Sequence, residues 1–398
     1  MNIIVITHEP FPIGMACTNR IISYSKGIVE IGNFVKVIIL RPTEKKEKLF
    51  NKNISGNYMG IEYEYVSEST IWPTNKLSKL NVVLKGYKNG IQYIDNFRKN
   101  NKIDAIISVS NYKIEAFVFY FISKIFRIKY IKEKSEFPFI LRNKSLLGRL
   151  YSYVYVNLMF KLYDGMIIMT NNLLEYFKNK VKKNAVLSLV PMTVEYERFI
   201  NIKTDKKEKY FAYCGEMSGN KDGLNNLLDS FKIISPKFDD LFLYLIGDSS
   251  KPEEFLLLKQ KVKDLLLENK VIFTGRIHRE EMPQYLCNST CLVLSRPSSL
   301  QSDGGFPTKL GEYLSTGNPV IVTKVGEIPN YLTDGENAFL VEPDDIIAFA
   351  EKMQYVIDNP EIAQKVGLKG RGVVLEKFNY KKQAQIIIDL IQKLNSRF

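Results

Sequence analysis

The feature that most constrains the fold of this chain is a regular alternation of strand and helix signals. A hydrophobic run typical of a buried strand, Asn2–Thr7, is followed by a loop, a helical segment at Ala16–Glu30 and a second strand signal at Val35–Leu40. Gly32 stands where it would end that helix. Strands that are joined through a helix pair in parallel. The alternation therefore predicts an α/β fold built on parallel sheets.

The alternation begins twice, which predicts two domains. Near Ile200 the composition changes to a short charged connector, NIKTDKKEK, after which strand and helix signals start again. A chain of 398 residues is also too long for one ordinary hydrophobic core. We expect two doubly wound, Rossmann-like domains that face each other across a cleft. The first would comprise residues 1–195, completed by a C-terminal helix at 380–398, and the second residues 205–378.

The stretch from Leu294 to Val325 is the strongest candidate for a ligand site. A strand signal ends near Leu294, a loop rich in Ser and Gly follows, and a helical segment then runs from Thr308 to Ser315. This order points the unpaired N–H groups of the helix N-terminus at the space above the strand ends, which favours an anion such as a phosphate. Lys309 lies in the first turn, where it opposes the helix dipole, so ligand binding explains it better than a structural role does. Glu312, one turn further on, offers a carboxylate to the same region.

A second lysine, Lys221, precedes a helix predicted to begin near Gly223 and follows a strand predicted to end at Gly215. Because the loops at the carboxyl ends of neighbouring parallel strands meet, we expect Lys221 and Lys309 to approach one anionic group. The sequence has two histidines and no D-x-D pair. Phosphate would then be neutralised by lysines and helix dipoles rather than by a carboxylate-bound metal, and no metal site is expected.

The net positive charge of the chain comes from its first half. Residues 1–200 contain 30 Lys and Arg and 16 Asp and Glu, a balance of +14, whereas residues 201–398 contain 26 and 27, a balance of −1. This asymmetry predicts an anionic partner for the first half, such as acidic lipid, a phosphorylated acceptor or nucleic acid. The alternative is a solvated, lysine-rich surface.

One segment of the basic half, Leu146–Tyr163, is apolar or aromatic on nearly all sides when it is drawn as a helix. Such a helix is either buried in the core or lies against lipid, and both readings stay open. Met1 leads directly into a strand, and no apolar run is long enough to span a bilayer. We therefore expect a cytoplasmic protein. The four cysteines show no C-x-x-C spacing and are expected to be reduced thiols.

Three segments of the second half carry a family resemblance: GEMSGNKDGLNNLLDSF, VIFTGRIHREEMPQYLCNSTCLVLSRPS and GGFPTKLGEYLSTGNPVIVTKVGEIPNYLTDGENAFLV. They resemble the donor-binding segments of retaining glycosyltransferases of family 4 (glycosyl transferases group 1), which have the two-domain GT-B fold. In the first half, Ser135 to Pro138 resembles the H-E-x-P loop of that family. The resemblance is most specific over residues 304–341.

The resemblance implies roles for particular residues. Lys221 would contact the donor diphosphate, with Lys309 beside it, and Glu312 would hydrogen-bond the nucleotide ribose. Glu136 is a candidate for positioning the acceptor, although an ion pair with Lys134 or Lys132 explains it nearly as well. The other residues implied in donor binding are Gly14, Gly215, Arg276, Asp303, Gly304, Gly305, Phe306, Pro307 and Thr308.

The sequence departs from the family pattern at three positions. The family has a carboxylate eight residues before Glu312, where this chain has Gly304 next to Asp303. Glu216 stands where a basic residue is frequent, and Ser135 where the first domain usually has a histidine. These departures bear on the contacts to the donor sugar more than on those to the phosphates.

The resemblance as a whole implies a metal-independent, retaining hexosyltransferase without a cofactor, which takes a UDP- or GDP-sugar as co-substrate. The acceptor would be a glycan or a lipid-linked molecule used in bacterial surface polysaccharide or glycoconjugate synthesis. The basic first half suggests a peripheral contact with the inner face of the cell membrane, and no nucleic acid partner is expected. Two alternatives stay open: a non-catalytic GT-B partner subunit with a degenerate donor site, and a GT-B-fold nucleotide-sugar epimerase.

Overall fold

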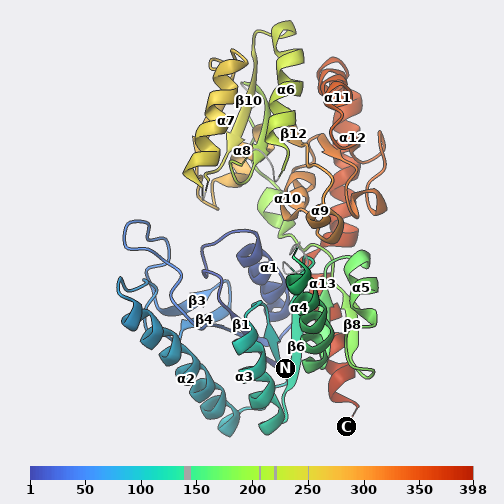
Figure 1. The fold of residues 1–398 in the computed structure, drawn as a ribbon. Coiled ribbons are helices and arrows are strands. Elements are labelled where there is room, and N and C mark those ends of the chain that lie inside the picture. The colour runs from blue at the N-terminus through green and yellow to red at the C-terminus, as the bar shows by residue number, and fades with distance from the viewer. Residues whose placement is uncertain (139–144, 206–207, 219–221, 250, 398) are drawn as a thin grey trace. The chain divides into compact units, whose positions relative to one another are not determined.

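The computed structural model describes residues 1–138, 145–205, 208–218, 222–249 and 251–397. The chain forms two compact units. Unit 1 contains Met1–Thr193 together with the C-terminal segment that begins at Tyr380, and unit 2 contains Val194–Asn379. The last helix of the chain therefore belongs to the same unit as the first strand (Figure 1).

Unit 1 is built on an eight-stranded sheet with the order β3-β4-β2-β1-β5-β6-β7-β8. All neighbouring strands are parallel except β3 and β4, which form an antiparallel pair at one edge. The strands are β1 (Asn2–Thr7), β2 (Phe34–Ile39), β3 (Ser55–Tyr58), β4 (Ile61–Tyr65), β5 (Ala105–Ser108), β6 (Lys129–Lys134), β7 (Gly165–Ile168) and β8 (Val186–Leu189).

Helices cover both faces of this sheet, which makes unit 1 doubly wound. Helices α1 (Ala16–Glu30) and α13 (Tyr380–Asn395) pack into one apolar cluster with the sheet. On the opposite face, a second cluster contains residues of α2 (Lys76–Asn100), α3 (Lys113–Ile125), α4 (Leu146–Met159) and α5 (Asn171–Lys178). Alternate residues of the central strands supply each cluster: Ile3 and Val5 face α1, and Ile4 and Ile6 face the other side.

Unit 2 has a six-stranded, entirely parallel sheet with the order β11-β10-β9-β12-β13-β14. Helix α6 packs beside α11 and α7, and α10 packs beside α12 and α8. Its strands are β9 (Lys209–Cys214), β10 (Leu241–Ile246), β11 (Val271–Gly275), β12 (Cys291–Leu294), β13 (Val320–Thr323) and β14 (Phe339–Val341). Its helices are α6 (Leu224–Ile234), α7 (Pro252–Asp264), α8 (Met282–Asn288), α9 (Leu300–Gly304), α10 (Thr308–Thr316), α11 (Ile346–Asp358) and α12 (Pro360–Val373), which continues as a π-helix at Val374–Phe378.

The strand orders place one topological switch point in each sheet. In unit 1 the order reverses between β1 and β5, and in unit 2 it reverses between β9 and β12. Ligands of open α/β sheets bind outside the carboxyl ends of the strands at such a point. Each unit therefore has one edge where a site is expected.

Several short elements were not predicted from the sequence. The segment after Leu294, predicted as a loop, contains the helix α9, where Ser299 and Ser302 form a capping box. The prediction of a loop was wrong there because serines that favour loops also favour helix N-termini. The structure also adds β3, α5 and β8, and α4 ends at Met159, where a 3-10 turn begins, instead of continuing to Tyr163.

Candidate active site

Three neighbouring strands of unit 2 end in glycine at the switch-point edge. Gly215, Gly247 and Gly275 follow or end β9, β10 and β11. A Cβ on Gly215 would lie 2.1 Å from Lys309 Nζ, and a Cβ on Gly247 would lie 2.0 Å from the carbonyl oxygen of Gly215. Gly247 also has a φ of 140°, which side chains rarely adopt. A side chain at Gly215 would displace the Lys309 ammonium, and one at Gly247 would collide with the backbone of Gly215.

Lys309 lies in the first turn of α10, as predicted, but it has a structural partner. Its Nζ donates hydrogen bonds to Asp222 Oδ2 at 2.6 Å and to Tyr213 Oη at 3.0 Å. Lys309 therefore has a structural role as the partner of Asp222, and the prediction that such a role is weak was wrong. Asp222 precedes α6 and lies 87 positions away along the chain, so local sequence patterns do not indicate the pair.

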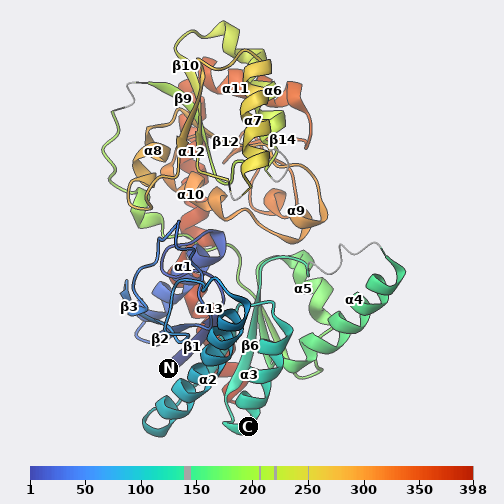
Figure 2. The same ribbon diagram turned by 60° about the vertical axis from the view of Figure 1, so that its left-hand side comes forward.

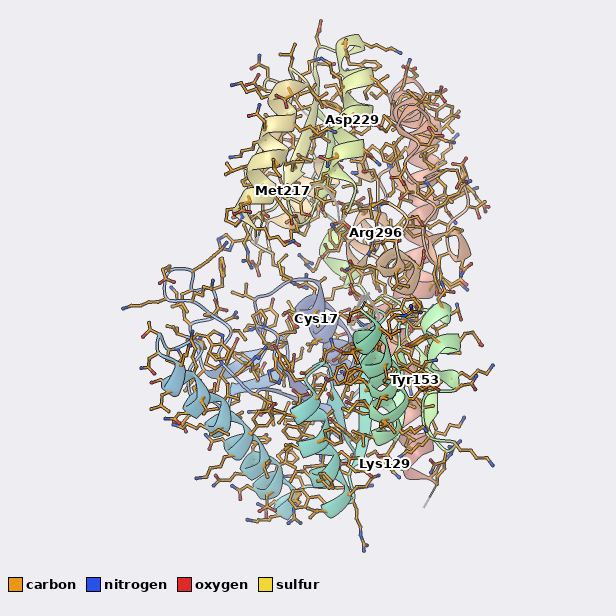
Figure 3. All side chains as sticks on the ribbon, in the orientation of Figure 1. Cys17, Lys129, Tyr153, Met217, Asp229 and Arg296 are labelled. Carbon is orange, nitrogen blue, oxygen red and sulfur yellow. The ribbon has the colours of Figure 1, made fainter. Side chains whose placement is uncertain are left out.

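The Asp222 carboxylate lies between two cations, Lys309 and Arg296. Burial raises the pKa of its carboxyl, but Lys309 and Arg296 lower it more, to about 2. Arg296 Nε lies 4.0 Å from Asp222 Oδ1, and the Arg296 side chain is almost fully buried. One carboxylate therefore faces two cations, which leaves one positive charge at the switch point. Arg296 is labelled in Figure 3.

The first turn of α10 is not capped by a side chain within the described part of the chain. Pro307 is its N-cap residue, and Thr308 is its first residue. The N–H of Leu310 donates a hydrogen bond to the Pro307 carbonyl at 3.0 Å, and anion binding by the preceding N–H groups of that turn stays a prediction.

Glu312 lies one turn beyond Lys309 and pairs with Arg198. The Glu312 Oε1 accepts a hydrogen bond from Arg198 Nη1 at 3.0 Å, and the two side chains are 20% and 14% exposed. Arg198 comes from the 3-10 turn Tyr196–Phe199. Beside the pair, burial and the Glu312 carboxylate raise the pKa of the Cys214 thiol to about 12, which keeps this thiol protonated. Arg198 and Asp222 are the two partners that sequence reasoning missed in this unit.

The remaining predicted residues of unit 2 fall into three environments. Asp303 and Gly304 are the last two residues of α9, and Gly305 is its C-cap. The ring of Phe306 is buried against Tyr331 and Phe378, at centroid distances of 5.6 and 5.4 Å, so only its backbone is available to a ligand. Arg276 directly follows β11 and is exposed. Lys221 lies outside the described residues.

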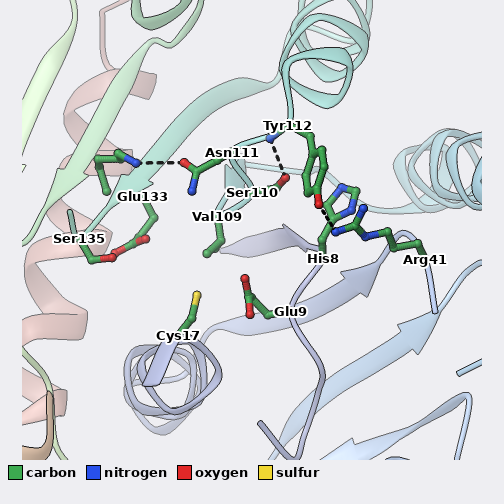
Figure 4. A pocket seen from close by; sticks show the side chains of 11 residues that line it. His8, Glu9, Cys17, Arg41, Val109, Ser110, Asn111, Tyr112, Glu133 and Ser135 are labelled. Atoms are coloured by element: carbon green, nitrogen blue, oxygen red, sulfur yellow. Dashed lines mark hydrogen bonds between the residues drawn. The ribbon is translucent and has the colours of Figure 1, made fainter. Parts of the chain in front are cut away.

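Unit 1 has a pocket of about 380 Å³ at its own switch point. It is lined by residues that follow β1, β2, β5 and β6, among them Glu9, Arg41, Asn111 and Ser135. Figure 4 shows Glu9 pointing into the pocket, with His8, Arg41 and Tyr112 gathered at one end. The Arg41 guanidinium lies 4.1 Å from the centre of the Tyr112 ring.

The floor of this pocket contains buried charges from β6. Lys134 Nζ donates a hydrogen bond to Asn111 Oδ1 at 3.0 Å, and Arg20 Nε donates one to Glu133 Oε1 at 2.7 Å. Burial, together with the neighbouring Lys134 ammonium, lowers the pKa of Lys132 to about 7. A strand of alternating Lys and Glu is rarely buried unless it supports a polar site.

Glu9 is the candidate functional residue of unit 1 that sequence reasoning missed. Burial raises the pKa of its carboxyl, although His8 and Arg41 lower it in part. His8 in turn contacts the fully buried Glu115, which accepts a hydrogen bond from Ser108 Oγ at 3.0 Å. The signal available in the sequence was the His-Glu pair at the end of the first strand.

The other predicted residues of unit 1 have different settings. Ser135 lines the pocket, whereas Glu136 is not one of the described residues that line it, so its role with the acceptor stays a prediction. A Cβ on Gly14 would lie 2.0 Å from Thr18 Oγ1, and that hydroxyl donates a hydrogen bond to the carbonyl of Pro10 at 2.7 Å. Gly14 is thus required by the packing of its own loop.

Comparison with known families finds a match in the second half of the chain. The family described as "Glycosyl transferases group 1" matches residues 196–373. The chain is 30% identical to an alpha-1,3/1,6-mannosyltransferase of Dictyostelium discoideum over 48% of this chain and 47% of that protein. It is 26% identical to the capsular polysaccharide biosynthesis glycosyltransferase CapM of Staphylococcus aureus, over 52% of this chain and 53% of CapM. The chain thus spans about half the length of these curated relatives.

Solved structures resemble the whole chain. The sucrose-phosphate synthase of Thermosynechococcus elongatus has a TM-score of 0.75 at 16% identity, and the likeness covers 100% of both chains. HepE of Anabaena, solved in complex with UDP and glucose, has a TM-score of 0.72 at 16% identity and covers 98% of this chain and 99% of HepE. These likenesses, together with the two parallel-sheet units, confirm the predicted GT-B fold class.

Proposed function

Because residues 196–373 match the glycosyl transferases group 1 family and the chain has the GT-B fold, we propose that it is a metal-independent, retaining glycosyltransferase. It transfers a hexosyl group from a nucleotide sugar to a glycan or lipid-linked acceptor. The observation that carries this proposal is the Lys309 ammonium at the uncapped first turn of α10, inside the matched family region.

Unit 2 binds the donor in this proposal. The first turn of α10 and Lys309 hold the diphosphate, and the Glu312 carboxylate accepts a hydrogen bond from the ribose while Arg198 fixes its orientation. A UDP-sugar is the first donor to try because HepE, which shares the fold, was solved with UDP and glucose. GDP-sugars are the second.

The chemistry assigned to these groups is stabilisation of the leaving diphosphate. As the bond between the anomeric carbon and the phosphate oxygen breaks, negative charge grows on that oxygen, and in this proposal the Lys309 ammonium and the helix N–H groups stabilise it. The acceptor hydroxyl attacks from the face that the diphosphate leaves, which gives retention at the anomeric carbon. Asp222 acts as a positioning residue, since it fixes the Lys309 side chain through the 2.6 Å hydrogen bond.

Unit 1 takes the acceptor in this proposal, in its switch-point pocket. Glu9 points into that pocket (Figure 4), and its carboxylate is the group we assign to accept the proton of an acceptor hydroxyl. The likeness to CapM, a capsular polysaccharide biosynthesis glycosyltransferase, supports a place in surface polysaccharide synthesis. The positive balance of residues 1–200 supports an anionic, lipid-linked acceptor.

The test is acceptor-dependent transfer. UDP- and GDP-sugars are incubated with a panel of lipid-linked and free glycan acceptors in the presence of a chelator, and nucleoside diphosphate release is followed with the anomeric configuration of the product by NMR. We expect release only when an acceptor is present, and a product with the anomeric configuration of the donor. Interconversion of the donor without an acceptor would indicate an epimerase, and the absence of any reaction or donor binding would indicate a non-catalytic subunit.

A further inference from the structure

Helix α4 in unit 1 exposes most of its apolar side chains. Leu146, Leu147, Leu150, Tyr153 and Leu158 are each 59% exposed or more. The buried residues of the helix form a narrow stripe, Ser152, Val156 and Met159, with which it rests on the unit. The sequence predicts that this helix is either buried in the core or lies against lipid. Because most of its apolar side chains are exposed in the structure, it is not a core helix. Tyr153 is labelled on it in Figure 3.

The neighbouring helix α3 extends this apolar surface. Ile114, Phe117, Phe121 and Ile125 recur at helical spacing and are between 47% and 70% exposed. The two helices meet where the Lys113 ammonium, at the start of α3, lies 3.9 Å from the centre of the Tyr151 ring of α4. A monomeric protein in water rarely leaves such a set of large apolar side chains uncovered, and patches of this kind mark interaction sites.

Basic and aromatic residues border the surface beside α5. A pocket of about 300 Å³ is lined by side chains of α4 and by Tyr176 of α5. Figure 2 labels both helices. The pocket is lined by Arg149, Tyr153 and Asn157 of α4 and by Tyr176 and Lys180. The Lys180 ammonium lies 4.1 Å from the centre of the Tyr176 ring. Two cations and two phenol rings at the edge of an apolar face suit the boundary between lipid headgroups and acyl chains.

We propose that α4 and the outer face of α3 dock on a bilayer containing anionic phospholipid, and that the α4–α5 pocket receives the phosphate of one headgroup. The apolar side chains enter the acyl boundary, while Arg149 and Lys180 remain at the level of the phosphates. Charge favours a bilayer over another protein, because the apolar face is bordered by cations in a half of the chain that carries +14. The inference rests on the proposed function only in that a lipid-linked acceptor gives such docking a use.

The experiment is flotation of the full chain with vesicles of phosphatidylcholine alone and with vesicles in which part of it is replaced by phosphatidylglycerol. We expect binding to the mixed vesicles that weakens with salt. Arg149→Gln with Lys180→Gln should lower the partition coefficient on mixed vesicles about 25-fold, since each basic residue near an anionic surface contributes about fivefold, or about 1 kcal/mol. The control Lys365→Gln with Lys369→Gln removes two exposed lysines from α12 and should have much less effect.

A second pair of variants tests the apolar face. Leu147→Gln with Leu150→Gln should abolish binding, whereas Leu256→Gln with Leu257→Gln, which changes two leucines of α7 that are 65% and 71% exposed, should not. The proposal is overturned if the unmodified chain does not float with the mixed vesicles. It is also overturned if Leu147→Gln with Leu150→Gln floats as well as the unmodified chain. If the unmodified chain forms a dimer and does not bind vesicles, and if Leu147→Gln with Leu150→Gln makes it monomeric, the surface binds a second copy of the chain instead. Transfer to a water-soluble acceptor is measured in parallel, so that loss of docking is separated from failure of the proposed function.

Discussion

At the scale of the residue, the proposed donor site depends on Lys309. We predict that Lys309→Ala lowers kcat by about 10²- to 10³-fold, as expected when one preorganised contact to a developing negative charge is removed. Steady-state kinetics with the best donor of the panel measures the effect. Lys324→Ala is the matched control, because Lys324 forms an exposed ion pair with Glu342 at 2.7 Å. Equal kinetics of the two variants would contradict the assignment.

Asp222 gives a prediction of stability against pH. Its folded pKa of about 2 lies below the usual 3.8, so it contributes stability above pH 3.8 that is lost as the pH falls through about 2. A difference of this size corresponds to on the order of 2 kcal/mol in the free energy of unfolding. Asp222→Asn should therefore be less stable than the unmodified chain at pH 7, and the difference should shrink toward pH 2. Denaturant unfolding at both pH values measures it, and a constant difference would refute the linkage.

Lys132 predicts a dependence of the same sign in unit 1, in a higher pH range. Its folded pKa of about 7 lies below the usual 10.5, so the unfolded chain binds the extra proton between these values. Stability should rise with pH from about 7 upward, by at most about 1.4 kcal/mol per pH unit, and below pH 7 this dependence should vanish. Melting temperatures from pH 7 to 9 should show the slope in the unmodified chain and in the exposed control Lys76→Met, but not in Lys132→Met. Parallel slopes in all three proteins would disprove it.

The residue scale also shows where sequence reasoning reached its limit. The position of Lys309 in the first turn of a helix followed from local pattern, because helix ends are set by nearby residues. Its pairing with Asp222 did not, since 87 positions separate the two, and neither did the pairing of Glu312 with Arg198, which are 114 positions apart. Side-chain pairs of this kind are decided by the packing of the sheet and not by local sequence.

At the scale of the element, α13 is held against α1 by close backbone contact. A Cβ on Gly27 of α1 would lie 2.6 Å from the carbonyl oxygen of Tyr380 and 2.7 Å from the Cβ of Ala384. We predict that Gly27→Val separates the two helices and lowers the free energy of unfolding by several kcal/mol, within the range of overpacked cores. Hydrogen exchange of the α13 amides measures the separation. Gly372→Ala is the control, because a Cβ at Gly372 would meet no atom within 4 Å.

Helices and strands with strong hydrophobic periodicity could be predicted from the sequence. Short elements without such periodicity could not. The bounds of β1 and α1 agree with the sequence-based predictions. The edge strand β3, SGNY, has no apolar alternation and forms only because β4 offers it a partner. Helix α9 was hidden for a similar reason, because its five residues are fixed by the Ser299 cap and not by an apolar face.

At the scale of the whole molecule, the α/β class and the parallel sheets followed from the order of strands and helices. The Rossmann-like strand order could be expected from that order, since right-handed crossovers leave few topologies. The switch-point pocket of unit 1 could not, because its floor is made by charged residues of β6, and a run such as KYIKEK predicts a surface strand on composition alone. Burial of these charges is a property of the assembled sheet. Among the described residues, no helix is long and apolar enough to span a membrane.

The measurement that tests the central claim most directly is calorimetric titration of the full chain with UDP and with GDP in the presence of a chelator. The account predicts saturable binding of one nucleoside diphosphate per chain without a divalent cation, and much weaker binding by Lys309→Ala. Because a ligand at about a hundred times its dissociation constant adds about 2.7 kcal/mol to stability, a matching rise in melting temperature should accompany the heat. No saturable binding of either nucleotide, or binding that strictly requires a divalent cation, would contradict the account.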